Sequence, residues 1–264
     1  MVSGNGTEYN LTTPSAVASG ITAILKGSRV FSRRISLLVV LSMIAGLSAG
    51  KDQPADPDPN RFAKEIGAFQ EWDSKNAVPA EPVLFVGSSS IRMWRTRDCF
   101  GDLPVINRGF GGSHISDVLH FAGRLVLPYK PRVIVFYAGD NDIASGKSAQ
   151  RVFEDYRKFV GIVHAKLPDA RIIFLAIKPS ESRWSFWPET KRANELVQGW
   201  SRKDDRLLFA DLATPLLGPD GKPRSELFLG DKLHLNPAGY GVWTQALTPV
   251  LRKALASRRG TGSP

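Results

Sequence analysis

Five short, continuous apolar runs, separated by stretches of helical periodicity, place the strongest limit on how this chain can fold. The runs lie at 83–86, 105–106, 133–138, 172–177 and 207–210. Such runs are typical of parallel strands, because these strands are covered on both faces. Between them apolar residues recur at helical intervals, most clearly over 152–163 and 243–251. The pattern predicts the α/β class: a three-layer α/β/α sandwich of flavodoxin-like type, with a five-stranded, mainly parallel sheet.

The same alternation defines the expected domain. Phe62, Ile66 and Phe69 have the spacing of an opening helix, and no linker interrupts the pattern, so we expect one domain over 61–257. Residues 51–60 are rich in Pro and Asp, which favours a disordered linker. Residues 258–264 are expected to be a disordered basic tail.

Residues 1–50 have the layout of an N-terminal extension followed by a secretory signal peptide near 26–50. A basic segment, an apolar run over 35–47 and small residues at 48–50 follow one another in the order that such signals use. The basic residues are Lys26, Arg29, Arg33 and Arg34. The apolar run is shorter than the ~20 residues that a membrane-spanning helix needs. We therefore expect a secreted or periplasmic protein, without a stable membrane span in its mature form.

Composition excludes several function classes. With 42% apolar and 23% charged residues, the chain is neither wholly disordered nor a polytopic membrane protein. Residues 1–50 carry three of the ten net positive charges, and no basic run is interleaved with aromatic residues, so no nucleic-acid partner is expected. Cys99 is the single cysteine, and no Cys/His cluster has zinc-ligand spacing, so no metal is expected. The sequence leaves the oligomeric state open.

Four polar segments lie where the ligand edge of such a sheet is expected. In open α/β sheets ligands bind at the carboxyl ends of the strands. Three segments follow predicted strands and one precedes the last helix; they cover 87–91, 107–113, 139–142 and 231–237.

The segments at 87–91, 107–113 and 139–142 each allow a structural and a catalytic interpretation. A serine between a strand and a helix is exposed close to backbone N–H groups that can stabilise an oxyanion, although three serines also suit a helix cap or an anion-binding loop. Three glycines within 109–112 favour either a turn or a close backbone approach. Asn141 offers an amide donor, or forms an Asx turn.

In the segment 231–237, Asp231 and His234 are spaced so that a carboxylate can reach the imidazole Nδ1 while Nε2 faces the sheet edge. This arrangement orients a general base. The other histidines, His114, His120 and His164, have no such neighbour in the sequence. Asp211, at the end of the last predicted strand, is a rival acid partner.

Together the four segments resemble the SGNH hydrolases, a subgroup of the GDSL esterases and lipases. Gly-Ser-Ser at 87–89 stands where the family has Gly-Asp-Ser, and Gly112 stands at the glycine of its second block. Residues 139–142 match G-x-N-D, and residues 231–234 match D-x-x-H. The resemblance covers residues 80–257. Two departures are Ser88 and Ser113, each of which replaces an Asp found in relatives.

The resemblance implies a serine ester hydrolase that needs no cofactor or metal. Ser89 would be the nucleophile, His234 the base and Asp231 its acid partner. The backbone N–H groups of Ser89 and Gly112 and the amide of Asn141 would form the oxyanion hole. The substrate would be an acyl ester of a small molecule, polysaccharide or lipid: a simple carboxylic ester, a lysophospholipid or an acetylated sugar.

Two other functions remain open on the same fold. One is an acyltransferase, in which an alcohol replaces water. The other is a non-catalytic carbohydrate- or lipid-binding module, against which the presence of all four blocks argues. An aromatic cluster after the fourth strand could line an acyl or sugar pocket, or could be core or a lid anchor; it comprises Trp184, Phe186 and Trp187.

Overall fold

The computed structural model of the protein describes residues 53–256. The predicted signal peptide (1–50) and basic tail (258–264) lie outside these residues, and the domain boundaries stay predictions. Within 53–256 no helix has both the length and the apolar character needed to cross a membrane.

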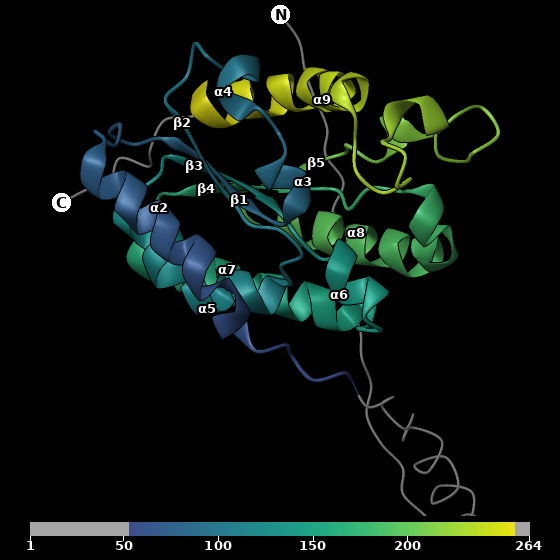
Figure 1. The fold of residues 1–264 in the computed structure, drawn as a ribbon, viewed down its shortest axis with the longest axis horizontal. Coiled ribbons are helices and arrows are strands. Elements are labelled where there is room, and N and C mark those ends of the chain that lie inside the picture. Colours follow the sequence, from purple (N-terminus) through teal and green to yellow (C-terminus); the bar gives the residue numbers. More distant parts are fainter. Residues whose placement is uncertain (1–52, 257–264) are drawn as a thin grey trace, which may run out of the picture. The chain divides into compact units, whose positions relative to one another are not determined.

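The centre of the fold is a five-stranded parallel sheet (Figure 1). Its strands are β1 (Val83–Gly87), β2 (Val105–Gly109), β3 (Val133–Tyr137), β4 (Arg171–Leu175) and β5 (Leu207–Ala210). The order in the sheet is β2-β1-β3-β4-β5, and every neighbouring pair is parallel. This is the flavodoxin-like order, in which the chain reverses direction across the sheet between β1 and β3. The predicted fold class is confirmed.

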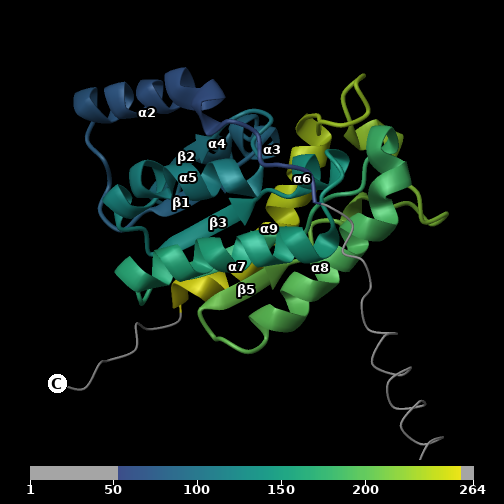
Figure 2. The same ribbon diagram turned by 90° about the horizontal axis from the view of Figure 1, so that it is seen from below.

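Helices cover both faces of the sheet (Figures 1 and 2). One face carries α2 (Ala63–Lys75), α5 (Ile115–Leu125), α7 (Ala149–Lys166) and α8 (Trp187–Ser201). The other carries α9 (Pro237–Ala256) with the short α3 (Ser89–Arg92) and α4 (Thr96–Cys99). Short α6 (Asp140–Ala144) follows β3 directly. Short 3-10 helices complete the described elements: η1 (Pro59–Phe62), η2 (Leu127–Tyr129), η3 (Glu181–Phe186), η4 (Thr214–Leu216) and η5 (Ser225–Leu227).

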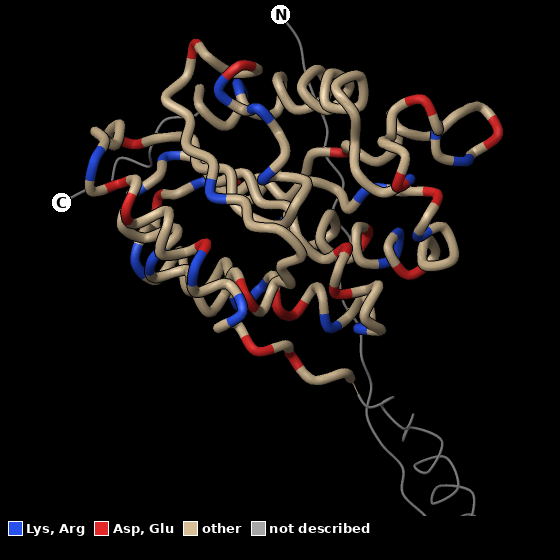
Figure 3. Tube along the Cα trace, in the orientation of Figure 1, with Lys and Arg blue, Asp and Glu red and all other residues tan. Residues whose placement is uncertain are grey.

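Alternate strand side chains pack into two separate cores. In β1, Leu84 and Val86 join the core under α5 and α7, whereas Val83 and Phe85 join the core under α9. All four are fully buried, which explains why the strand reads as one apolar run. Lys and Arg are interspersed with Asp and Glu along the outer helices and loops, while the central strands carry few of either (Figure 3).

The segment ahead of η1 differs from the expected disordered linker. Gln53 accepts a hydrogen bond from the Ser148 backbone N–H at 2.9 Å. Asp56 pairs with Lys147 and with Arg151, each at 2.7 Å. Residues 53–60 therefore contact the domain through side chains. Composition alone favours disorder here because it does not show that a buried lysine elsewhere needs a carboxylate partner.

Candidate active site

The turn after β1 presents Ser89 to solvent. Gly87 has φ +142°, and a Cβ at this position would lie 1.8 Å from the carbonyl oxygen of Tyr137, so only glycine lets the strands stay paired here. The Ser88 N–H donates to the same carbonyl at 3.0 Å. Ser88 and Ser90 are buried, whereas Ser89 is partly exposed. Of the three serines, the turn offers only Ser89 to a ligand.

His234 connects Ser89 to Asp231. Its Nε2 lies 2.9 Å from the Ser89 Oγ, and its Nδ1 lies 2.6 Å from the Asp231 Oδ2. A carboxylate can only accept, so Nδ1 carries the proton and Nε2 accepts from the serine hydroxyl. The second Asp231 oxygen accepts from the backbone N–H groups of Leu233 and His234, both at 2.9 Å. The hydrogen bond from His234, followed by these backbone bonds, lowers the pKa of Asp231 to about 2.

The rival carboxylate, Asp211, has a different role in the structure. Its Oδ1 accepts from the backbone N–H groups of Ala213 and Thr214 at 3.1 and 2.9 Å, at the start of η4. The structure therefore pairs His234 with Asp231, as the D-x-x-H spacing predicts.

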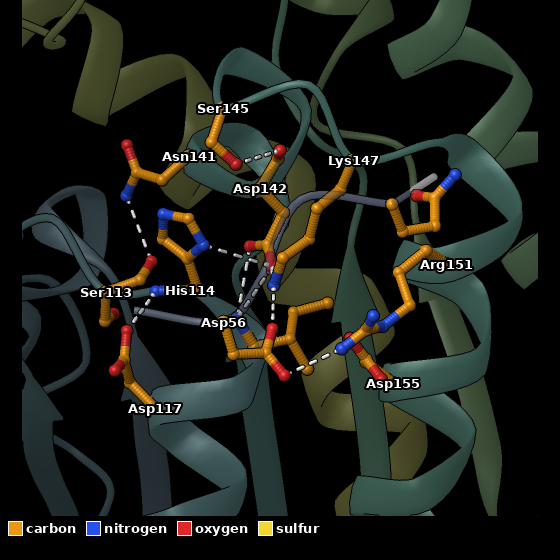
Figure 4. Close-up of polar contacts among 12 residues, drawn as sticks. Asp56, Ser113, His114, Asp117, Asn141, Asp142, Ser145, Lys147, Arg151 and Asp155 are labelled. Carbon is orange, nitrogen blue, oxygen red and sulfur yellow. Dashed lines mark hydrogen bonds and ion pairs between the residues drawn. The ribbon is translucent and has the colours of Figure 1, made fainter. Parts of the chain in front are cut away.

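Asn141 lies beside the glycine-rich loop that follows β2. Its Nδ2 donates to the carbonyl oxygen of Ser113 at 3.0 Å (Figure 4). Gly112, the preceding residue, has φ +75° and open space where a Cβ would be. This left-handed backbone conformation lies in the loop that contacts the start of α6, and a glycine adopts the conformation without strain.

The opposite end of the Asn141 amide is held by a cluster that the sequence does not reveal. Arg183 of η3 donates to the Asn141 Oδ1 at 3.0 Å and to the Asp140 Oδ1 at 2.6 Å. Lys178, itself buried, donates to the other Asp140 oxygen at 2.9 Å. Burial acts to raise the pKa of Asp140, but the Lys178 and Arg183 charges outweigh it and hold that pKa below its usual value. Both cations follow β4 at the ligand edge, which is the signal that could have found them.

A second buried network lies below Asn141 (Figure 4). Asp142 accepts from the Ile115 N–H at 3.1 and 3.2 Å and from the Lys147 Nζ at 2.8 Å. His114 Nδ1 lies 3.7 Å from Asp142, so this histidine has a carboxylate neighbour that its sequence position does not indicate. Burial lowers the pKa of His114 despite that neighbour. The network joins the starts of α5 and α6.

The carboxylates near the site, those of Asp140, Asp142 and Asp231, accept hydrogen bonds from N–H groups or cationic side chains. Across the described range 53–256, no three His, Cys, Asp or Glu side chains gather as a possible metal site. The assembled groups can remove a proton from Ser89, and Asn141 offers an amide donor after β3, the strand that pairs with β1.

Comparison with known proteins matches residues 90–242 to the sequence model of the GDSL-like lipase/acylhydrolase family. The chain belongs to this family. Among curated relatives, the platelet-activating factor acetylhydrolase IB subunit alpha1 of Homo sapiens is 29% identical over 229 residues, which cover 82% of this chain and 97% of the relative. The same subunit from Bos taurus is 29% identical over 227 residues, 81% of this chain and 96% of that one.

Solved structures share the fold of this GDSL-like acylhydrolase. A GDSL-like lipase from Bacteroides thetaiotaomicron superimposes with a TM-score of 0.60 at 20% identity, covering 75% of this chain and 98% of the lipase. A variant of an acetyl-xylooligosaccharide esterase from a Geobacillus species superimposes with a TM-score of 0.53 at 13% identity, covering 69% of this chain and 97% of the esterase. At these identities the likeness concerns the fold alone.

Proposed function

We propose that this GDSL-like acylhydrolase cleaves carboxylic esters with Ser89 as its nucleophile. The observation that carries the proposal is the continuous hydrogen-bonded chain from Ser89 through His234 to Asp231, with distances of 2.9 and 2.6 Å. Such a chain activates a weak nucleophile and orients its base.

The reaction would proceed through an acyl-enzyme. The Ser89 proton passes to the His234 Nε2 as the Oγ bonds to the acyl carbon, and the imidazolium returns that proton to the departing alcohol. Water, deprotonated by the same nitrogen, then attacks the acyl carbon. The bond from that carbon to the Ser89 Oγ breaks, and the imidazolium returns its proton to the Oγ, which releases the acid and regenerates Ser89. In both steps the developing oxyanion would be held by the Ser89 and Gly112 N–H groups and by Asn141.

Short acyl groups are the first substrates to test. The relatives named above act, by their names, on acetyl esters: one an acetylhydrolase and the other an acetyl-xylooligosaccharide esterase. The rings of Trp184 and Trp187 stack at 5.9 Å and are half-buried, and Trp184 directly follows Arg183, the partner of Asn141. We propose that this aromatic pair contacts the alcohol part of the ester.

The test is hydrolysis of p-nitrophenyl esters of increasing chain length, followed by a panel of acetylated sugars and lysophospholipids. Ser89→Ala should abolish turnover, because a lost triad member typically leaves only about 10³ to 10⁴ over the uncatalysed rate. Ser88→Ala and Ser90→Ala are matched controls, since both side chains are buried beside Ser89. Activity that survives Ser89→Ala but not Ser88→Ala would contradict the assignment.

We further propose that residues 1–50 direct export to the periplasm or the medium. The support is the order of basic, apolar and small residues over 26–50. The intact mass of exported protein should correspond to a chain that begins after about residue 50. Uncleaved protein in the cytoplasmic fraction of the native host would contradict export.

A further inference from the structure

The side-chain amide of Asn141 can serve an oxyanion in only one of its two orientations. The nitrogen end donates hydrogen bonds and the oxygen end only accepts them, yet the two ends have nearly the same shape. A half-turn about the last side-chain bond would point an oxygen at the developing negative charge. A catalytic role for Asn141 therefore requires neighbouring groups that hold its amide nitrogen toward the oxyanion.

Two neighbours of opposite character fix the orientation of this amide. The Ser113 carbonyl, 3.0 Å from Nδ2, can only accept, and the Arg183 guanidinium, 3.0 Å from Oδ1, can only donate. In the reversed orientation oxygen would face oxygen, and the amide NH₂ would face the guanidinium. Both hydrogen bonds would be lost together.

Arg183 is itself held by a second anchor. Its other terminal nitrogen donates to Asp140 at 2.6 Å, so the guanidinium fork bridges two consecutive residues of α6. The neighbouring Ser182 donates through its N–H and Oγ to the Lys232 carbonyl at 3.2 and 3.1 Å. Lys232 lies between Asp231 and His234 in the chain, so η3 contacts both the oxyanion side and the acid–base side of the site.

We propose that Arg183 is a positioning residue that holds the nitrogen end of the Asn141 amide toward the oxyanion. The inference rests on the proposed function, and it gives the loop after β4 a part in the chemistry. A planar fork is required, because a lysine ammonium is a point charge that can compensate Asp140 without also bridging to Asn141.

Arg183→Lys is the decisive variant. One charge-assisted hydrogen bond is worth a factor of about 10 to 10², so kcat for p-nitrophenyl acetate should fall by that factor while KM stays near the wild-type value. If Arg183 serves only to neutralise Asp140, lysine will restore full activity, and the proposal is wrong. If KM rises and kcat is unchanged, Arg183 binds the ground-state substrate instead, which also overturns it.

A double-mutant cycle separates positioning from general damage. In an Asn141→Ala background Arg183→Lys should cost nothing further, because the amide it orients is gone. Equal losses in both backgrounds would overturn the proposal. Arg206→Lys is the matched control: Arg206 holds Asp204 through two nitrogens at 2.9 and 2.6 Å, in the segment just ahead of β5, and its loss should leave kcat unchanged.

The orientation of the Asn141 amide can also be measured without catalysis, so the role of Arg183 can be tested independently of the proposed function. The two Nδ2 protons of Asn141, followed by NMR in ¹⁵N-labelled protein, should give one sharp pair of signals in the wild type and broadened or shifted signals in Arg183→Lys. A wild type that hydrolyses no ester and does not react with a fluorophosphonate probe defeats the proposed function, and the amide signals still decide the role of Arg183. Unchanged signals in Arg183→Lys would overturn that role.

Discussion

The orientation of the His234 ring depends on one exposed carboxylate. Asp231 holds the Nδ1 proton and is itself fixed by two backbone N–H groups. In Asp231→Asn the amide can donate to Nδ1, which favours the tautomer that cannot accept the Ser89 proton. We expect kcat to fall by up to about 10⁴, measured with p-nitrophenyl acetate under the same conditions as the wild type.

The control for this change is Asp211→Asn, which alters a carboxylate that accepts from backbone N–H groups at the start of η4 and has no contact with His234 among those described. It should retain most of the activity. An Asp211 variant that is the more damaging of the two would show that the acid partner has been misassigned.

The pH dependence follows from the lowered pKa of Asp231. With that pKa at about 2, the carboxylate stays ionised throughout mildly acidic solution. Its favourable interaction with His234 is therefore present above the ordinary aspartate range and lost only as the pH falls through about 2. We expect the acid limb of log kcat/KM to have a slope of one and not two, because Asp231 takes up no proton in mildly acidic solution. A slope of two in the same range would contradict this.

At the scale of elements, apolar runs predicted the buried strands but not all of their length. The run at 105–106 becomes β2 over five residues, because Asn107 and Arg108 extend the strand with polar side chains that have partners. The Asn107 amide donates to the Ile91 and Trp94 carbonyls at 2.7 and 3.1 Å, and Arg108 pairs with Asp73. A criterion based on hydrophobicity does not detect such residues, since their burial depends on partners elsewhere in the chain.

The candidate site was predictable to the extent that its parts are local. Asp231 and His234 are three residues apart, and Ser89 lies in a strand-to-helix turn, so spacing alone suggests their chemistry. The pairing of Arg183 with Asn141, or of Lys147 with Asp56, joins segments that are 42 and 91 positions apart. Such contacts depend on the register of packed helices and loops, which the sequence pattern does not specify.

The network between α5 and α6 leads to a stability prediction. Lys147 and Asp142 are both fully buried and pair at 2.8 Å, so Lys147→Met leaves a buried carboxylate without its cation. Breaking a buried pair in this way typically costs about 3 to 5 kcal/mol, and the backbone N–H of Ile115 should keep the loss near the lower end. Urea unfolding measures the change.

Lys158→Met is the matched control for this prediction. Lys158 also pairs with an aspartate, Asp155, at 2.9 Å, but 61% of its side chain is exposed. Asp155 is buried but keeps Arg151 as a partner at 2.7 Å, so loss of the exposed Lys158 ammonium should cost only about 0 to 1 kcal/mol. Equal, small losses in the two variants would show that the burial of Lys147 does not set the strength of its pairing.

At the scale of the whole molecule, contacts with residues that support the candidate site begin earlier in the chain than the family match. The match starts at residue 90, and the helical pattern predicts a domain that starts at residue 61. Yet Asp56 supplies the second carboxylate of Lys147, whose first partner, Asp142, directly follows Asn141. Burial acts to raise the pKa of Asp56, but the opposite effect of Lys147 and Arg151 is larger. The pKa of Asp56 is therefore below its usual value, which favours the charged carboxylate.

These contacts predict different behaviour for two shortened chains. A chain that starts at residue 51 keeps Gln53 and Asp56 and is the reference for stability and kcat. In a chain that starts at residue 61, Lys147 keeps only one carboxylate partner and loses the cover of the segment 53–60. The free energy of unfolding of this chain should be lower by about 1 to 3 kcal/mol, which a lower urea midpoint would show. Its kcat should fall as well, because α6 carries both Asp142 and Asn141.

Asp56→Asn in the longer chain isolates the charge from the rest of the segment and should reproduce part of both losses. If the chain from residue 61 is as stable and as active as the chain from residue 51, the segment 53–60 has no supporting role, and the domain starts where the helical pattern placed it.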